Sequence, residues 1–171
     1  SKNFSTIIAV GSGTICDTIK YSTFINKQNF SVFATSPMNA YTSANASLKF
    51  KGNRGSFKAH SAKGVYFDLS VISKCPKNLI SAGFSDVMCR TTAQVDWLLS
   101  NILLNTYYNS EPYDLLKLYE DKTIINAKKI IQGDTESLRY LIKLCTFMGL
   151  GTMIIGTSHL GSMAEHNISH Y

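Results

Sequence analysis

The 171-residue sequence has no long apolar run and no recognisable leader segment. No stretch approaches eighteen uninterrupted apolar residues, so the sequence predicts no membrane span. There is no basic-then-apolar start of the secretory type, and the first residue is not methionine, which is compatible with a processed, trimmed or internal start. Apolar residues make up 44% and charged residues 16%, a composition typical of a folded globular chain and not of a disordered one.

The cysteine pattern contains no CxxC pair. The four cysteines, Cys16, Cys75, Cys89 and Cys145, are far apart in the chain. This spacing indicates neither a zinc knuckle nor a disulfide framework, and it favours buried, reduced thiols in a cytoplasmic protein.

A block of basic residues is also missing, although the formal net charge is +6 and the sequence pI is near 9.1. The lysines are scattered, and none of them forms a cluster interleaved with aromatic residues. The sequence therefore gives little support for a nucleic-acid partner. A basic groove for small phosphorylated molecules fits the same charge at least as well.

The most informative stretch is 6–22, in which a β-branched apolar run ends at Gly11 and helical spacing begins near Ile15. This pattern predicts a strand, a tight glycine turn and a helix. Glycines let the backbone approach a ligand closely, and the first amides of the helix then point outward beside the positive end of the helix dipole. A phosphate suits such a site. The turn contains neither a complete Walker loop nor a complete GxGxxG, so an ordinary strand-to-helix turn remains an alternative.

The following segments predict a parallel sheet with an inserted hairpin. Residues 30–35 read as a second buried strand, which makes a βαβ unit with the first strand and helix. The polar loop 36–45 follows the second strand, and loops at the carboxyl ends of parallel strands line the ligand crevice. Residues 48–58 predict a hairpin, residues 65–67 a return to the main sheet, and Asp68 the cap of a short helix that ends before Pro76.

From residue 78 onward the pattern is helical. We expect one helix over 80–105 with a break near Gly83, a second that begins near Pro112 and continues toward residue 131, and a third from Asp134 to about Gly149. Gly149 and Gly151 are expected to interrupt that third helix, and a last helix starts at Ser162. The predicted fold class is α/β followed by all-α, with an α/β part over 1–75 and a helical part over 76–171.

Few residues outside the glycine turn suggest chemistry. Asp86 lies in a largely apolar helix, where an ion pair with Arg90 four residues later is the ordinary interpretation. His166 and His170 share a helix face at i,i+4 and could chelate zinc, but HExxH is absent because Glu165 directly precedes His166. A structural histidine pair is the commoner outcome of this spacing. No Ser/His/Asp triad or nucleophile elbow is visible.

Four segments in order resemble one family: GSGTICDTIKY, TSPMNAYTSANAS, LISAGFSDVMCRTTAQVDWLL and SHLGSMAEHNISHY. The chain resembles the dehydroquinate synthase-like and iron-containing alcohol dehydrogenase superfamily, and within it the sn-glycerol-1-phosphate dehydrogenases. The resemblance implies part of a Rossmann-like parallel-sheet domain followed by a C-terminal helical domain, incomplete at both ends. It also implies an NAD(P)-dependent, metal-assisted oxidoreductase that interconverts dihydroxyacetone phosphate and sn-glycerol 1-phosphate in cytoplasmic phospholipid biosynthesis.

The same resemblance implies roles for particular residues. Those matched to NAD or NADP and to the adjoining substrate side are Gly11, Ser12, Gly13, Thr14, Asp17, Ser36, Asn39 and Thr42. Asp86 and His166 match two of the three protein ligands of a catalytic divalent metal, usually zinc, that polarises the substrate carbonyl during hydride transfer. Glu165 and His170 are expected beside these ligands without binding the metal themselves.

Several positions depart from the family pattern. Asn39 and Ala40 stand where the family has Asp and Gly, and Leu160 and Met163 replace its usual residues before the Glu-His pair. The third histidine ligand would lie beyond Tyr171, and the βαβ unit for the adenosine end would precede the glycine turn. The alternatives are therefore a non-catalytic nucleotide- or phosphate-binding remnant of this fold and, with a poorer match, a lyase related to dehydroquinate synthase. A small phosphorylated substrate is the expected partner, and a homo-oligomer or a complementing chain segment is compatible with the exposed sheet edge that we expect at the N-terminus.

Overall fold

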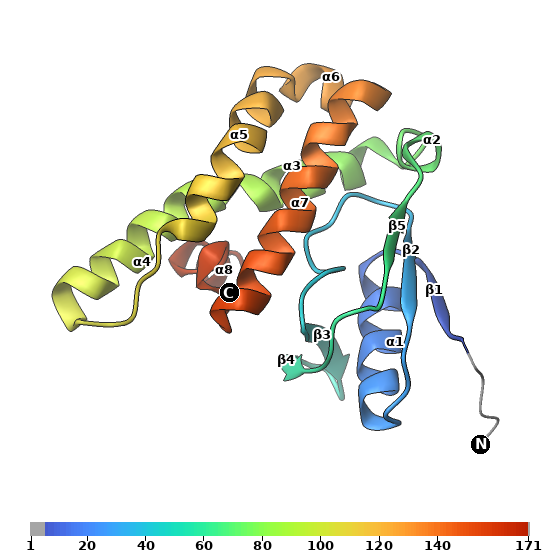
Figure 1. Cartoon of the computed structure of the whole chain (residues 1–171), viewed down its shortest axis with the longest axis horizontal. Coiled ribbons are helices and arrows are strands. Elements are labelled where there is room, and N and C mark those ends of the chain that lie inside the picture. The colour runs from blue at the N-terminus through green and yellow to red at the C-terminus, as the bar shows by residue number, and fades with distance from the viewer. Residues whose placement is uncertain (1–5, 171) are drawn as a thin grey trace.

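A computed structural model describes residues 6–170 of the chain (Figure 1). Within that range, the side chains that it leaves undescribed are those of Phe50, Asn53, Arg54, Asn167, Ser169 and His170. All the strands in the described part precede Asp68, and helices alone follow Pro76. The predicted order, α/β followed by all-α, is confirmed.

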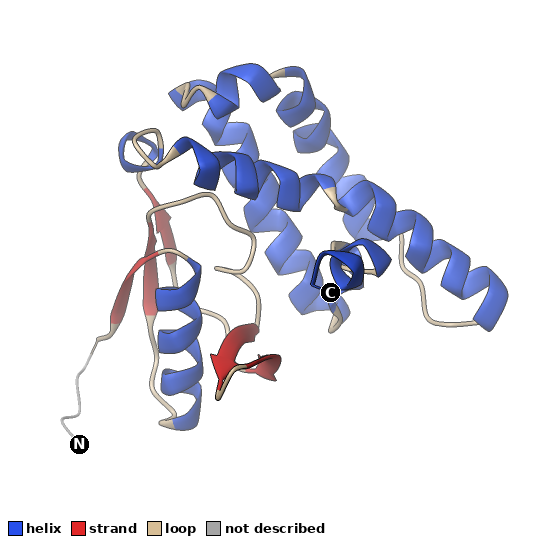
Figure 2. Ribbon diagram, turned by 180° about the vertical axis from the view of Figure 1, so that it is seen from behind, coloured by secondary structure: helices blue, strands red, loops and turns tan. Residues whose placement is uncertain are grey.

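The first part is a three-stranded parallel sheet in the order β1-β2-β5, formed by β1 (Ile8–Gly11), β2 (Ser31–Ala34) and β5 (Val65–Phe67). Ala9 pairs with Val32, and Val32 in turn pairs with Val65. Helix α1 (Gly13–Ile25) lies along one face of this sheet (Figure 2). Its Cys16 packs in one apolar cluster with Ala9 and Val32, because alternate strand residues point to the same face. The predicted βαβ unit is confirmed.

The opposite face of the sheet is bare in the described part of the chain. Ile8 and Val10 on β1 are each 58% exposed, and Tyr66 on β5 is 61% exposed. β1 also has a free edge, since the described residues offer it no partner other than β2. Parallel sheets are normally covered on both faces. The exposed apolar side chains on this face and the unpaired edge of β1 are therefore typical of a surface that packs against another element.

An antiparallel hairpin, β3 (Asn45–Phe50) with β4 (Asn53–Lys58), packs against α1 as an insertion between β2 and β5. It confirms the predicted hairpin. The short helix α2 (Leu69–Ile72) follows β5, and the Asp68 carboxylate caps it by accepting hydrogen bonds from the Ser70 N–H at 2.8 Å and the Ser70 hydroxyl at 2.7 Å.

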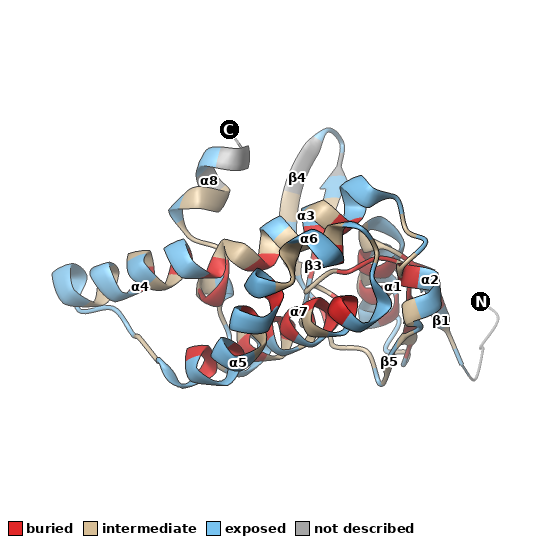
Figure 3. Ribbon diagram, turned by 90° about the horizontal axis from the view of Figure 1, so that it is seen from above, coloured by how far each residue is buried: buried red, intermediate tan, exposed pale blue. Residues whose placement is uncertain are grey.

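The second part is a helical bundle around α7. Its elements are α3 (Lys77–Met88), α4 (Arg90–Leu104), α5 (Glu111–Ile125), α6 (Ala127–Ile131), α7 (Thr135–Ile155), the 3₁₀ turn η1 (Ser158–Leu160) and α8 (Ala164–His170). α7 contacts α2, α3, α5, α6 and η1. Buried residues gather along it, whereas much of α4 is exposed (Figure 3). Trp97, Leu116, Leu141 and Met148 belong to the core that these helices share.

Four expectations about where helices begin, end or break are wrong. The helix expected over 80–105 is two helices that meet at Cys89, and the segment after Pro112 is likewise divided at Asn126. Gly83 does not break α3, which continues through it to Met88. The glycine instead allows the Pro37 carbonyl to approach the helix, since an added Cβ would lie 2.4 Å from that oxygen.

Gly149 and Gly151 do not interrupt α7 either. A Cβ on Gly149 would lie 2.1 Å from the Asn39 carbonyl oxygen, and one on Gly151 would lie 2.4 Å from Leu160 Cδ2. Both glycines therefore permit close packing within a continuous helix. From the sequence alone the two glycines suggest a helix break. For Gly149 the residue that packs closely against it, Asn39, is far away in the chain and cannot be recognised from the local sequence.

Among the residues that the structure describes, α7 is the one helix that is long and apolar enough to cross a membrane. Nearly half of its most apolar window, 44%, is buried inside the fold. The core helix of an ordinary globular bundle has the same properties, and α7 contributes Leu138, Leu141, Leu144 and Met148 to the shared core. That packing accounts for the buried part of its apolar surface, whereas Phe147, Met153 and Ile154 of the same helix are exposed.

Candidate functional site: a cleft at the carboxyl edge of the sheet

The turn between β1 and α1 forms one wall of the site. Gly11 has φ +155°, and a Cβ there would lie 2.7 Å from Ile15 Cδ1, so the turn requires glycine. Ser12 is the N-cap of α1, yet its side chain accepts no hydrogen bond from the helix amides. The first turn of α1 also contains no acidic residue. The positive end of this helix therefore has no anionic side chain of its own.

The Ser12 hydroxyl is used elsewhere, in a short polar chain that joins two strand ends. Its Oγ lies 2.6 Å from Ser36 Oγ, and Ser36 Oγ lies 3.4 Å from the Tyr41 hydroxyl. The Tyr41 hydroxyl donates to the Gly11 carbonyl at 3.2 Å. Burial raises the pKa of Tyr41 above its ordinary value, so this hydroxyl remains a donor at neutral pH. Ser12 and Ser36 were predicted from the sequence, whereas no local pattern indicated Tyr41.

These elements enclose a cleft of about 770 Å³. Its lining comes from the α1 N-terminus, the loop after β2, the β3 strand and the α3 helix. The predicted cofactor residues that line it are Ser12, Gly13, Thr14, Asp17, Ser36 and Asn39. Asp86, predicted as a metal ligand, lies in the same lining on α3, and Lys49 of the hairpin adds a cation that the sequence analysis did not assign.

A buried lysine holds the wall of the cleft in place. Lys20 is fully buried on α1, and its Nζ donates to the Ala40 carbonyl at 2.6 Å and to the Asn45 carbonyl at 2.9 Å. Asp17 lies 3.4 Å from the same ammonium group and accepts a hydrogen bond from the Ser47 N–H at 3.0 Å. The Asp17 carboxylate thus faces the cleft while it tethers the hairpin, a structural task that the sequence did not reveal.

Thr42 is directed away from the cleft. Its side chain is buried, and the hydroxyl donates to the Thr146 carbonyl of α7 at 3.0 Å. Thr42 is therefore absent from the cleft lining, although its hydroxyl also lies 3.4 Å from the carbonyl oxygen of Asn39, which lines the cleft. Its hydroxyl joins the loop after β2 to the helical bundle at the point where Gly149 allows close packing.

The two predicted metal ligands are brought together. Asp86 on α3 and His166 on α8 are 80 positions apart in the numbering, yet Asp86 Oδ1 lies 3.5 Å from His166 Nε2. Both side chains are partly buried, with exposed fractions of 34% and 23%. Burial raises the pKa of the Asp86 carboxyl, and the neighbouring His166 opposes that shift.

The alternative pairing of Asp86 with Arg90 is absent from the described part of the chain. Arg90 instead forms a buried ion pair with Glu120 of α5, and its guanidinium lies over the Tyr113 ring at 5.3 Å. It also donates to Gln94 Oε1 at 3.1 Å. Because Arg90 is occupied in the helical core, the Asp86 carboxylate faces α8 and the cleft.

Glu165 orients the imidazole from the other side. Its Oε1 lies 2.8 Å from His166 Nδ1 and accepts a hydrogen bond from the Met163 N–H at 3.0 Å. Burial alone would raise the pKa of Glu165, but the hydrogen bonds from Met163 and His166 hold it below the ordinary value. A carboxylate on one ring nitrogen typically fixes the tautomer of a metal-binding histidine. The His170 side chain lies outside the described residues.

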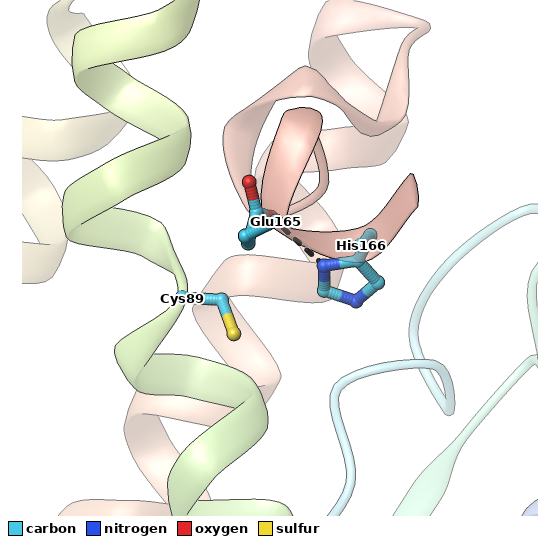
Figure 4. Close-up of side chains that lie close together, drawn as sticks. All are labelled: Cys89, Glu165 and His166. Carbon is cyan, nitrogen blue, oxygen red and sulfur yellow. Dashed lines mark hydrogen bonds and ion pairs between the residues drawn. The ribbon is translucent and has the colours of Figure 1, made fainter. Parts of the chain in front are cut away.

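Figure 4 shows Cys89, Glu165 and His166 close together. One ligand atom from each of these residues lies within 4.8 Å of the other two. Cys89 stands at the junction of α3 and α4, one helical turn after Asp86. The sequence favoured a buried thiol at this position, whereas Cys89 is only partly buried.

Residues 1–76 match the family model of the iron-containing alcohol dehydrogenases. A glycerol-1-phosphate dehydrogenase [NAD(P)+] from Pyrococcus furiosus is 35% identical over 165 residues, which cover 95% of this chain and 47% of that protein. Its counterpart in Geobacillus thermodenitrificans is 29% identical over 96% of this chain and 41% of its own length. The resemblance to the sn-glycerol-1-phosphate dehydrogenase family is confirmed. The chain spans about half the length of the curated relatives that it matches.

Solved structures show the same fold. A probable glycerol dehydrogenase from Sinorhizobium meliloti aligns with a TM-score of 0.75 at 20% identity, over 96% of this chain and 48% of its own. An iron-containing alcohol dehydrogenase from Thermotoga maritima aligns with a TM-score of 0.71 at 16% identity, over 91% of this chain and 47% of its own. The arrangement of a parallel sheet followed by a helical bundle is thus the arrangement found in these dehydrogenases.

Proposed function

We propose that this chain forms the cofactor cleft and part of the metal centre of an NAD(P)-dependent oxidoreductase that acts on a small phosphorylated substrate. The pair proposed by analogy with the curated relatives is dihydroxyacetone phosphate and sn-glycerol 1-phosphate. The observation that carries the proposal is that a single cleft is lined by both the α1 N-terminus and Asp86, with His166 only 3.5 Å from that carboxylate.

The α1 terminus supports binding of a dinucleotide phosphate. The N-terminal amides of a helix and its dipole favour an anion, and no acidic side chain competes in the first turn. Gly13 contributes to the cleft lining, and a Cβ there would lie 3.1 Å from Sδ of Met38, which also lines the cleft, so a larger residue would crowd this wall. The loop that carries Ser36 and Asn39 forms the facing wall.

The Asp86–His166 pair fits a divalent metal. A carboxylate oxygen and an imidazole nitrogen are donors that zinc accepts, and Glu165 already orients the ring through its other nitrogen. The chemistry that NAD(P) and such a metal supply together is hydride transfer at a carbon whose oxygen the metal polarises. Asp86 and His166 would hold the ion, and we propose zinc as the metal. The α1 terminus and Ser36 would orient the nucleotide.

A nucleotide titration tests the cofactor part of this proposal. In Thr14→Asp, a carboxylate at the α1 terminus would repel the phosphates, and we expect NADH affinity, followed by fluorescence, to fall by more than about tenfold. Ser22→Asp, an exposed position two turns farther along α1, is the matched control and is expected to bind as the wild type does. Equal affinity in both variants would exclude the α1 terminus as the phosphate site.

A non-catalytic remnant that binds nucleotide or phosphate is the second candidate. Its support is the set of departures from the family pattern, of which Asn39 lines the cleft and Leu160 is fully buried in the helical core. The two candidates differ in turnover: NADH oxidation with dihydroxyacetone phosphate and zinc supports the oxidoreductase, whereas tight NADH binding without metal binding supports the remnant.

A further inference from the structure

Lys49 is a cation in the cleft to which the family resemblance assigns no role. It lies on β3, and among the described residues that line the cleft it is the one basic side chain. Lys49 is exposed, and it forms no ion pair and no side-chain hydrogen bond with the described part of the chain. Its positive charge is therefore available to a bound molecule.

The two acidic residues of the same lining already face cationic or metal-binding groups. The Asp17 carboxylate lies 3.4 Å from the buried ammonium group of Lys20, which compensates its charge. The Asp86 carboxylate lies 3.5 Å from His166 and is a proposed metal ligand. On the hairpin side of the cleft, the charge of Lys49 is thus left uncompensated by the described residues, and it favours an anion there.

The fold fixes the backbone that carries Lys49. The Lys20 ammonium group donates to the Asn45 carbonyl at 2.9 Å, and the Asp17 carboxylate accepts a hydrogen bond from the Ser47 N–H at 3.0 Å. Both bonds join α1 to β3 within four positions of Lys49, and the hairpin lies beside α1 (Figure 1). The helix whose N-terminus is the proposed phosphate site therefore also positions the strand of Lys49, and a strand that is held before binding lowers the cost of binding.

We propose that Lys49 pairs with a phosphate monoester of a bound molecule, separate from the pyrophosphate that the α1 terminus would hold. The inference rests on the proposed function, because it concerns a ligand of the same cleft. A phosphate monoester carries about 1.5 to 2 negative charges at pH 7, and a lysine ammonium group binds it as a point charge. Two molecules of the proposed reaction carry this group: NADP, on its ribose 2′ oxygen, and dihydroxyacetone phosphate.

Binding measurements on Lys49→Met test the inference, with Lys58→Met as the matched control. Lys58 lies on β4 of the same hairpin, is exposed, and is not part of the cleft lining. Both variants replace an exposed lysine of the hairpin by a neutral side chain of similar length, so a general effect of net charge changes them equally. NADH and NADPH affinities are followed by fluorescence. Dihydroxyacetone phosphate and unphosphorylated dihydroxyacetone are titrated calorimetrically with zinc and NAD⁺ present, because hydride transfer cannot occur between two oxidised partners.

We expect Lys49→Met to bind one of the two phosphate monoesters about three- to tenfold more weakly, because an exposed charge pair is partly screened by solvent and salt. A loss for NADPH with NADH unchanged would support the inference and assign the 2′-phosphate to Lys49. A loss for dihydroxyacetone phosphate with dihydroxyacetone unchanged would support it and assign the substrate phosphate. Lys49→Arg, which keeps the charge, should retain most of the affinity, and Lys58→Met should bind as the wild type does.

Three results would overturn the inference. Wild-type affinity of Lys49→Met for all four molecules would remove the role of Lys49, while NADH binding that Thr14→Asp weakens would leave the proposed function intact. Equal losses in Lys49→Met and Lys58→Met would indicate a general charge effect. Equal losses for NADH and NADPH, with dihydroxyacetone phosphate unaffected, would assign Lys49 to the pyrophosphate. A wild type that binds neither the nucleotides nor dihydroxyacetone phosphate would overturn the proposed function as well.

Discussion

Replacement of Gly149 by alanine tests whether the loop after β2 is held tightly against α7. A Cβ at this position would lie 2.1 Å from both the Asn39 carbonyl oxygen and Thr42 Oγ1. Real Cβ atoms do not approach backbone oxygens this closely, so the loop or the helix has to move. The same movement disturbs the hydrogen bond from the Thr42 hydroxyl to the Thr146 carbonyl.

The expected magnitude follows from three contributions. Alanine in a helix interior gains about 1 kcal/mol over glycine. Overpacking costs about 1–3 kcal/mol, and loss of the Thr42 hydrogen bond costs about 1 kcal/mol. The net destabilisation is therefore about 1–3 kcal/mol, which for a chain of this length lowers the melting temperature by roughly 2–12 °C.

Thermal unfolding followed by circular dichroism measures this shift. Ile154→Ala, at a position of the same helix that is 76% exposed, is the control and should change stability by no more than about 0.5 kcal/mol. Because the loop also forms a wall of the cleft, Gly149→Ala should weaken NADH binding as well. If Gly149→Ala were as stable as the wild type or more so, the close contact between loop and helix would be refuted.

Two further predictions concern buried and exposed charges. Glu120→Ala leaves the Arg90 guanidinium buried without its counter-ion, so urea denaturation should show that the free energy of unfolding falls by about 3–5 kcal/mol. Glu136→Ala removes one partner of an exposed ion pair with Arg139, and the free energy of unfolding should fall by less than about 1 kcal/mol. Equal losses in the two variants would contradict the buried ion pair. Hydrogen bonds from Ser137 hold the pKa of Asp134 below its ordinary value, so its stabilisation is complete above about pH 4 and is lost as the pH falls through that lowered pKa. Melting curves at pH 2–6 should show this loss in the wild type relative to Asp134→Asn, and parallel pH profiles would contradict it.

Local patterns predicted the elements that are built from neighbouring residues. The β-branched run before Gly11 and the helical spacing after it specified the first strand, turn and helix, and Asp68 capped its short helix as expected. Binary patterning and caps act over a few residues, so they can be read directly from the sequence. The resemblance to a known family supplied the pairing of Asp86 with His166, which spacing alone did not contain.

Features that depend on distant contacts were not predictable in this way. Gly149 looked like a helix break because the Asn39 carbonyl that requires it is remote in sequence. The break between α3 and α4 falls at Cys89, which itself has helical φ and ψ (−58° and −19°), and no glycine or proline marks it in the sequence. No local pattern indicates that Lys20 is buried, because the carbonyls of Ala40 and Asn45 that surround its ammonium group are twenty or more residues away in the chain. In each case tertiary contacts override the local preference.

We propose above all that Asp86 and His166 form a metal centre beside a nucleotide cleft. Calorimetric titration of zinc into the protein with NADH present tests it most directly, with Asp86→Ala and His166→Ala compared with the wild type. Asp114→Ala, an exposed carboxylate on α5, is the control. We predict micromolar or tighter zinc binding in the wild type and the control, and its loss in both ligand variants. Weak zinc binding that is indifferent to Asp86 and His166 would contradict the metal centre.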